Sequence, residues 1–339
     1  YPLWSDGVQK RRWIILPQGA RIDTSDMDHW QFPVGTKLFK EFAQHGQLLE
    51  TRLVERIASS GKVDKDYKLA TFVWREEQDD AVETKDGAQD VLGTDHNVPA
   101  QKLCLDCHRG EPGRVLGVSA LQLSRSGLLE TLAKRARLSV DPKRTYEIPG
   151  DEVAAAAAGY MHANCGHCHS DAGQAPSSLH MRLSVNELDN PLEQSELYET
   201  TIHQAITEWK DHPEEFTERV VPGDPERSAV YFRMKQRGDE VPSNDQMPPL
   251  ATEKVHFEGV AAVKAWIELL PKASPSQPAT DDNHSDAAPE KPAADGGKPM
   301  PEMQSTKPAK RDNPPAPDAS PTPNMGDVPS EPIDMPTAG

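Results

Sequence analysis

Two short motifs contain all four cysteines of this 339-residue chain. The first is Cys104-Leu105-Asp106-Cys107-His108, and the second is Cys165-Gly166-His167-Cys168-His169. A Cys-x-x-Cys-His run is typical of a c-type haem attachment site. Each thiol forms a thioether to one haem vinyl group, and the following histidine binds the iron as its proximal ligand. The sequence therefore predicts two covalently attached haem c groups, with Cys104, Cys107, Cys165 and Cys168 as attachment residues and His108 and His169 as iron ligands.

Zinc binding and disulfide formation are the alternatives for these cysteines. Two Cys-x-x-Cys pairs can together form a four-thiolate zinc site, but zinc does not require a histidine after each pair. The 57 residues between Cys107 and Cys165 are also many more than one zinc module uses. A disulfide across two intervening residues would be strained and would close almost no loop. We therefore favour two covalent haems and keep zinc as the main alternative.

Composition divides the chain near Lys272. From there onward Pro, Ala, Ser and Asp dominate, and aliphatic residues are scarce. Such a segment cannot bury enough apolar surface to offset its chain entropy, so we expect a disordered tail over residues 272–339. The tail has 6 Lys+Arg and 11 Asp+Glu, a net charge of −5, and the total of −17 leaves −12 on residues 1–271.

The acidic body argues against nucleic acid and anionic membranes as partners, and it fits a basic protein redox partner. The sequence has no transmembrane run of about twenty apolar residues. The chain begins at Tyr1 without a methionine, so we expect a processed chain whose lost leader was a secretion signal. Attachment of haem through this motif takes place outside the cytoplasmic membrane in bacteria. The expected location is therefore the periplasm or the cell surface.

Residues 1–100 have the pattern of a small antiparallel β domain. Four apolar or alternating runs, separated by turn residues such as Pro17, Gly35 and Gly46, predict strands. The runs are Trp13–Leu16, Lys37–Phe42, Leu49–Val54 and Ala70–Trp74. Residues 101–149 contain the first haem motif, and we expect this segment to pack on the β domain. Within it, residues 127–138 have helical spacing, and Pro142 follows.

Residues 150–271 are expected to form an all-α class I cytochrome c domain. Asp151 begins a helix that leads into the second haem motif. Residues 229–235 predict an amphipathic helix, and residues 257–270 predict a terminal helix that ends before Pro271. The predicted fold class is thus α+β, with a β-rich N-terminal domain, an all-α C-terminal domain and a disordered tail.

Met247 is the predicted distal ligand of the second haem. Pro248 and Pro249 follow it and stiffen the loop. A thioether opposite His169 would raise the reduction potential and close the iron site. The first haem has no evident distal ligand. His96, eight residues before Cys104, is the tentative choice, and His162, Met234 and Met27 remain open, as does an open first iron.

Over nearly all of residues 1–271 the sequence resembles a bacterial family of two-haem c-type cytochromes. The matching segments are 1–7, 10–12, 32–36, 50–53, 164–169 and 247–249, which read YPLWSDG, KRR, FPVGT, ETRL, NCGHCH and MPP. The resemblance implies the haem content and a two-part architecture. It gives little information on the partners, and the tail lies outside it.

Three functions fit these observations. The first is electron transfer between extracytoplasmic redox partners, with both irons six-coordinate. The second is a two-haem peroxidase-like enzyme, which requires an open first haem and a positioned acid or base. The third is a redox docking subunit of a surface enzyme complex. We favour electron transfer because only the haem motifs and one axial Met have positive evidence.

Overall fold

The computed structural model describes residues 1–175, 178–238, 241–242, 245–272 and 332–335. Residues 1–272 and a short strand near the C-terminus belong to one compact unit. The predicted disordered tail lies almost entirely outside the described residues. Ile333–Met335 is the exception, because the structure has a strand there.

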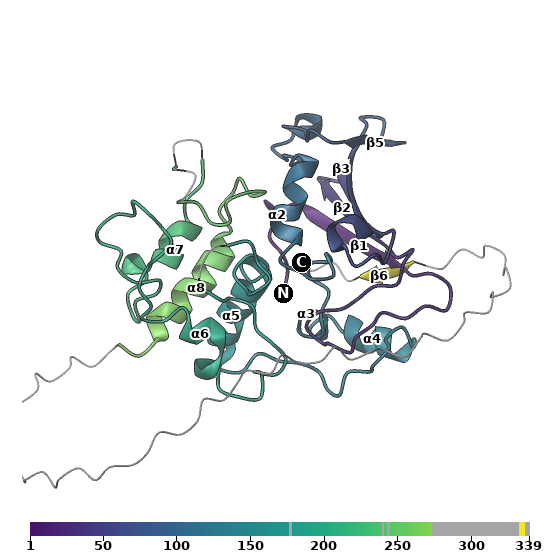
Figure 1. The fold of residues 1–339 in the computed structure, drawn as a ribbon. Coiled ribbons are helices and arrows are strands. Elements are labelled where there is room, and N and C mark those ends of the chain that lie inside the picture. Colours follow the sequence, from purple (N-terminus) through teal and green to yellow (C-terminus); the bar gives the residue numbers. More distant parts are fainter. Residues whose placement is uncertain (176–177, 239–240, 243–244, 273–331, 336–339) are drawn as a thin grey trace, which may run out of the picture. The chain divides into compact units, whose positions relative to one another are not determined.

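An antiparallel sheet of six strands forms one part of this unit (Figure 1). Its order is β5-β4-β3-β2-β1-β6. The strands are β1 (Gln9–Ile15), β2 (Lys37–Gln44), β3 (Gln47–Arg56), β4 (Tyr67–Trp74), β5 (Ala81–Thr84) and β6 (Ile333–Met335). The four runs that predicted strands coincide with β1 to β4, whereas β5 and β6 were not predicted.

The β2–β3 hairpin shows how the sequence fixes the sheet. His45 and Gly46 both have positive φ, at 52° and 83°, and they form the two-residue turn. This backbone twist matches the twist of two antiparallel strands. Beyond the turn Lys40 pairs with Arg52 and Phe39 pairs with Leu53. Side chains alternate between the two faces, so the register decides which residues face the functional site.

The α-helices of the described residues are short, apart from two. They are α1 (Val63–Asp66), α2 (Cys104–His108), α3 (Ala120–Ser124), α4 (Leu128–Lys134), α5 (Glu152–Asn164), α6 (Glu196–Glu199), α7 (Ala229–Met234) and α8 (Phe257–Leu269). Asp151 caps α5 by accepting a hydrogen bond from the Ala154 amide at 2.8 Å. Helices α5 and α8 pack closely, since a Cβ on Gly259 would lie 2.2 Å from the Tyr160 ring.

The prediction of an all-α class I cytochrome c domain is wrong. Of the described residues between α5 and α8, only α6 and α7 are α-helical, with four and six residues. The intervening chain satisfies its backbone groups through turns and isolated bridges, such as Ile202 with Val220 and Ala205 with Glu218. Prolines interrupt this stretch, among them Pro191, Pro213, Pro222 and Pro225, and proline favours turns over helix propagation. The predicted α+β division into a β domain and an all-α domain is therefore replaced by a six-stranded sheet and a few helices joined by long irregular connections.

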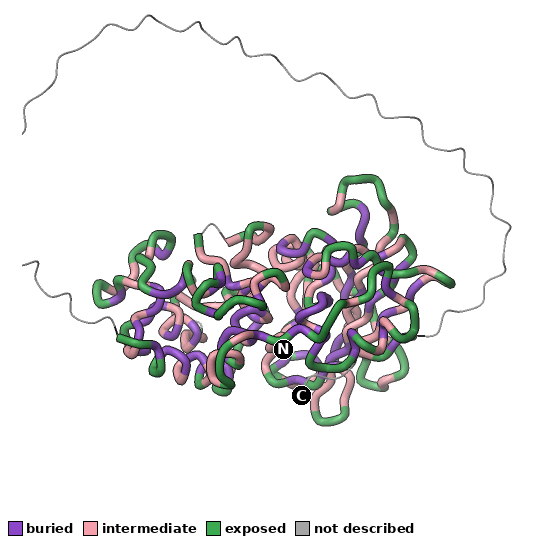
Figure 2. Tube along the Cα trace, turned by 90° about the horizontal axis from the view of Figure 1, so that it is seen from below, coloured by how far each residue is buried: buried purple, intermediate pink, exposed green. Residues whose placement is uncertain are grey.

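One hydrophobic cluster joins the sheet to the helices. It contains Ile14 of β1, Leu121 of α3, Met161 of α5 and Trp266 of α8, all nearly inaccessible to solvent. Figure 2 shows buried stretches in both the strands and the helices of the unit. Cys165 of the second Cys-x-x-Cys-His motif packs against this cluster.

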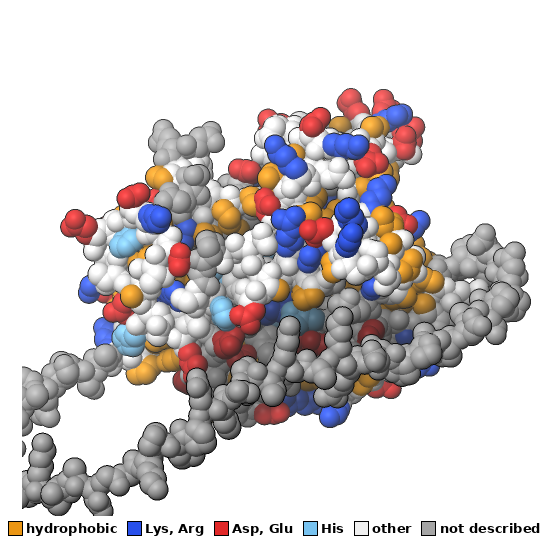
Figure 3. Space-filling model, in the orientation of Figure 1, with side chains coloured by type: hydrophobic (Ala, Val, Ile, Leu, Met, Phe, Trp, Pro, Cys, Tyr) orange, Lys and Arg blue, Asp and Glu red, His pale blue; other side chains and the backbone are white. Residues whose placement is uncertain are grey.

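The face of the molecule shown in Figure 3 carries interspersed acidic and basic side chains. In the part of the chain that the structure describes, no helix has the length and apolar character needed to cross a bilayer.

Candidate cofactor site

The first Cys-x-x-Cys-His motif forms helix α2. Cys104 and Cys107 lie one turn apart and are half-buried free thiols. The helical turn brings His108 next to the same cavity that both thiols line. This local geometry places two nucleophilic sulfurs and one imidazole on one wall, which is the set that a covalent haem requires.

The His108 side chain is held in a defined tautomer. Its Nδ1 lies 2.7 Å from the carbonyl oxygen of Arg114, and a carbonyl only accepts, so Nδ1 carries the proton. Burial lowers the pKa of His108 to about 4, and the charges of Arg52 and Lys40 act in the same direction. The ring is therefore neutral, with its lone pair on Nε2. A backbone carbonyl on the other nitrogen is the usual arrangement of a metal-binding histidine.

The second motif follows the end of α5. The Cys168 and His169 amides both donate to the carbonyl of Cys165, at 3.0 and 2.9 Å, so the motif is wound as one tight turn. Burial raises the pKa of Cys165 to about 12. Burial also lowers the pKa of His169 to about 4, with a further contribution from Arg233. His169 is thus a neutral imidazole, like His108.

The two motifs touch each other, which the sequence did not predict. Cys107 and Cys168 share a hydrogen bond, and possible ligand atoms of Cys107, His167 and Cys168 all lie within 4.8 Å of one another. The hydrogen bond with Cys168, together with burial, raises the pKa of Cys107, whereas the same bond lowers the pKa of Cys168. Next to this contact Gly110 packs against the main chain of His167. No sequence signal shows that motifs 57 residues apart meet in space.

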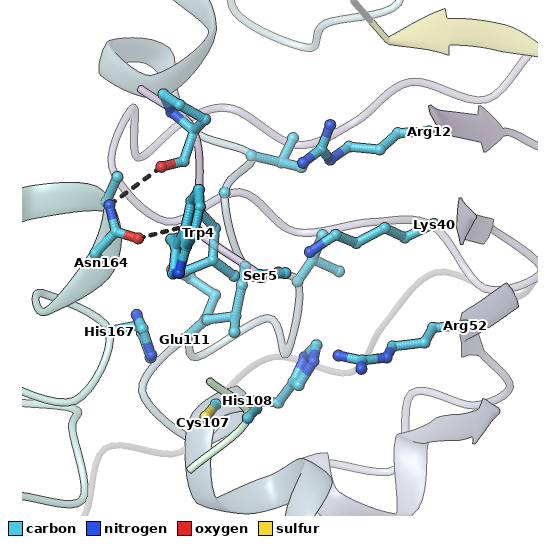
Figure 4. Close-up of a pocket in the computed structure, with 18 of the residues that line it drawn as sticks. Trp4, Ser5, Arg12, Lys40, Arg52, Cys107, His108, Glu111, Asn164 and His167 are labelled. Carbon is cyan, nitrogen blue, oxygen red and sulfur yellow. Dashed lines mark hydrogen bonds between the residues drawn. The ribbon is translucent and has the colours of Figure 1, made fainter. Parts of the chain in front are cut away.

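A cavity of about 690 Å³ lies beside the first motif (Figure 4). Its size falls within the range of about 300–1,000 Å³ that is usual for small-molecule and cofactor sites. The walls are one face of β1 to β3, the N-terminal residues 1–6, helix α2, the end of α5 and residues 248–252. In the close-up Arg12, Lys40 and Arg52 point from three strands into this space. None of these cations was predicted as a site residue, although strand alternation places them on one face of the sheet.

The N-terminal residues form one wall of the cavity through contacts with α5. The Trp4 amide donates to Asn164 Oδ1 at 2.7 Å, and Asn164 Nδ2 donates to the Pro2 carbonyl at 3.1 Å. The Trp4 indole stacks on His256, with ring centres 3.9 Å apart and an interplanar angle of 7°. Asn164 directly precedes Cys165, so these two hydrogen bonds connect the N-terminal segment to the start of the second motif.

His96, the tentative distal ligand of the first haem, lines the cavity. Its Nε2 lies 2.9 Å from Oε2 of Glu50, a fully buried carboxylate on β3. Burial alone would raise the pKa of Glu50, but Arg52 and His96 outweigh it and hold the pKa below its usual value. The Nε2 of His96 is therefore engaged in the structure, and its role as an iron ligand stays a prediction.

His162, the other histidine considered for this role, also lines the cavity. Its Nδ1 accepts a hydrogen bond from the Leu183 amide at 3.0 Å, so the neutral ring carries its proton on Nε2. Burial lowers the pKa of His162 to about 3. Nδ1 is thus occupied by a hydrogen bond and Nε2 by a proton. Neither nitrogen has a free lone pair for the iron of the first haem.

Met247 lies on the loop that the sequence predicted. It is half-buried, and its amide donates to the carbonyl of Arg233 at 3.1 Å. The residues directly after it, Pro248 to Thr252, line the cavity next to the first motif, whereas Met247 is not part of that lining. Its assignment as the distal ligand at the second motif stays a prediction.

The chain has no match among protein-family models, curated proteins or solved structures.

Proposed function

We propose that this chain is a two-haem c-type cytochrome that transfers single electrons between protein redox partners in the bacterial periplasm or at the cell surface. The observation that carries the proposal is the state of His108 beside Cys104 and Cys107. Its Nδ1 proton is fixed on the Arg114 carbonyl, and its neutral Nε2 is left for a metal. We also propose that the chain belongs to a bacterial family of two-haem c-type cytochromes.

The contact between the motifs supports electron transfer within the chain. Haems attached at Cys107 and Cys168 would begin from sulfur atoms that already touch. These two residues would hold the two haems from neighbouring positions, which favours electron transfer within the chain. The formal charge of −12 on residues 1–271 favours a basic partner at one end of this path.

The direct test is a haem count on the full chain produced with a bacterial cytochrome c maturation system. A pyridine haemochrome assay should give two thioether-linked haems per chain. The double variant Cys104→Ser/Cys107→Ser should retain one haem, and Cys165→Ser/Cys168→Ser should retain the other. A chain with no haem would contradict the proposal.

A metal site is the second candidate, because Cys107, His167 and Cys168 lie within reach of one ion. Two thiolates and an imidazole suit zinc. This site would leave Cys104, Cys165, His108 and His169 without a function, so we rank it below haem attachment. Stoichiometric zinc in the purified chain, bound without haem, would support this candidate instead.

The peroxidase-like alternative depends on an open first iron. Carbon monoxide added to the reduced protein should leave both haems nearly unchanged if both irons are closed, and peroxide turnover should be negligible. Binding to about half of the haem would favour the enzyme. His96→Ala tests the tentative ligand: it should convert only the first haem to a form that binds carbon monoxide. An unchanged spectrum would assign His96 to its bond with Glu50 alone.

A further inference from the structure

Three basic side chains lie in one row across the sheet. In the strand register Arg12 of β1 pairs with Lys40 of β2, and Lys40 pairs with Arg52 of β3. All three point into the cavity beside the first motif (Figure 4). Like charges directly opposite each other destabilise a sheet, so this row requires an explanation.

Only one of the three cations has its charge balanced. Arg52 Nη2 donates to Glu50 Oε2 at 3.1 Å, and Arg52 Nε bonds the other oxygen of the same carboxylate. For Arg12 and Lys40 the described residues provide no hydrogen-bond or ion-pair partner. Lys40 Nζ lies 4.9 Å from the centre of the Phe42 ring, and the Glu50 carboxylate, which is bonded to Arg52, attracts it only at longer range. Two cations therefore remain side by side at the cavity wall.

The surroundings make these charges costly. Burial lowers the pKa of Lys40 well below its usual value, and the charges of Arg12 and Arg52 lower it further. Burial also lowers the pKa of Arg12. The cavity lining includes Arg125 as well, whereas the chain as a whole has a charge of −17. A positive site inside an acidic protein indicates an anionic ligand.

We propose that Arg12 and Lys40 bind the two propionate carboxylates of the haem attached at Cys104 and Cys107. This inference rests on the proposed function. A haem c carries its thioether links on one edge and its two carboxylates on another part of the rim, with an apolar macrocycle between them. The cavity lining contains all three kinds of feature: the thiols and His108 on helix α2, apolar side chains such as Leu38 and Val54, and the cations on β1 and β2.

Within the row, the two unbalanced cations match the two carboxylates in number. Bound carboxylates would turn a repulsive row into paired, hydrogen-bonded charges, which is the arrangement that buried ions require. His108 lines the same cavity as these cations. The row and the proximal histidine therefore belong to one site.

The test measures reduction potentials of the matured two-haem chain as a function of pH. Lys40→Met and Arg12→Gln each remove one proposed partner, and Lys40→Arg keeps the charge. Arg11→Met is the matched control, because Arg11 neighbours Arg12 on β1 but is 64% exposed and pairs with Glu41 on the opposite face.

In the wild type, paired propionates should stay ionised near neutral pH, and the potential of the first haem should be nearly constant there. Loss of Lys40 or Arg12 should raise the pKa of one propionate. A protonated propionate favours the ferrous haem, so the potential of this haem should fall as the pH rises through that pKa. It should also lie below the wild-type potential at alkaline pH. The potential of the other haem should not change in these variants. In Arg11→Met and Lys40→Arg the potentials of both haems should have the pH dependence of the wild type.

The outcomes are distinguishable. Two haems per chain with both test variants indistinguishable from Arg11→Met would overturn the assignment while leaving the proposed function intact. Absence of haem from the wild type would remove both. If Lys40→Met does not accumulate with two haems, Arg12→Gln alone decides, because its side chain keeps much of the length of the original.

Discussion

The main-chain carbonyl oxygen of His167 lies against Gly110, 1.5 Å from the position that a Cβ on Gly110 would occupy. This contact joins the segment after the first motif to the middle of the second. The backbone of Gly110 does not have a positive φ, so space rather than conformation requires glycine here. The closeness of the two motifs therefore depends on one missing methyl group.

Gly110→Ala should destabilise the protein, because the methyl group meets main-chain atoms that have no alternative rotamer. Overpacking of this kind costs about 1–3 kcal/mol. Urea denaturation of the holoprotein measures the loss. Gly117→Ala is the comparison: its Cβ meets nothing within 4 Å, and only its φ of 74° opposes the change. If Gly110→Ala lowers the free energy of unfolding no more than Gly117→Ala does, the contact between Gly110 and His167 does not hold the two motifs together.

Asn164→Ala should release the N-terminal segment from α5. The substitution removes the acceptor of the Trp4 amide and the donor to Pro2, and buried hydrogen bonds of this kind are worth about 0.5–1.5 kcal/mol each. Limited proteolysis should then cleave within residues 1–8 faster than in the wild type. Asn190→Ala, at an exposed position, is the control and should leave the cleavage rate unchanged.

His162 should make stability depend on pH in the acid range. Its pKa is about 3 in the folded chain, because of burial, and about 6.5 when unfolded. The folded state binds fewer protons between these values, so the stability is full above about pH 6.5 and falls as the pH decreases, by at most about 1.4 kcal/mol per pH unit.

His162→Leu should lower the stability at pH 7, because the Leu183 amide loses its acceptor, but the variant should lose less on acidification. Denaturant midpoints at several pH values measure both effects. His45→Asn, in the exposed turn between β2 and β3, should follow the wild type. If the denaturant midpoints of His162→Leu and the wild type fall in parallel as the pH decreases, the pKa of His162 is not lowered in the folded chain.

Met247→Ala should lower the potential of one haem and abolish the near-infrared sulfur–iron charge-transfer band, because a thioether stabilises ferrous iron. Met161→Ala is the control: Met161 is fully buried in the main core, where its loss should reduce stability and leave the band intact. An unchanged band and potential in Met247→Ala would remove this residue from the coordination sphere.

Local patterns predicted the local structure well. Apolar or alternating runs between turn residues located β1 to β4, and the acidic start at Asp151 located α5 and its cap. Both helices of thirteen residues were expected within one or two residues of their observed ends. Such features depend on neighbours in sequence, which is the information that periodicity and capping contain.

Properties that depend on distant segments were missed. Strand β6 pairs with β1 across more than 300 residues of chain, through only three residues that carry no strand signal of their own. The prediction of an all-α domain failed because it was based on the second motif and the terminal helix. These two features do not determine the structure of the chain between them. The meeting of Cys107 with Cys168 and the row from Arg12 to Arg52 both depend on tertiary packing and register.

If the proposed function is right, the hydrogen bond between Cys107 and Cys168 affects the order of haem attachment and folding. In the folded, haem-free chain the thiol of Cys107 faces another sulfur, and its raised pKa disfavours the reactive thiolate. The same bond lowers the pKa of Cys168, so the two thiols would not react equally once the motifs have met. On the proposed function, the attachment at Cys107 would therefore be favoured before the two motifs close on each other, and the supply of haem would have to keep pace with export and folding.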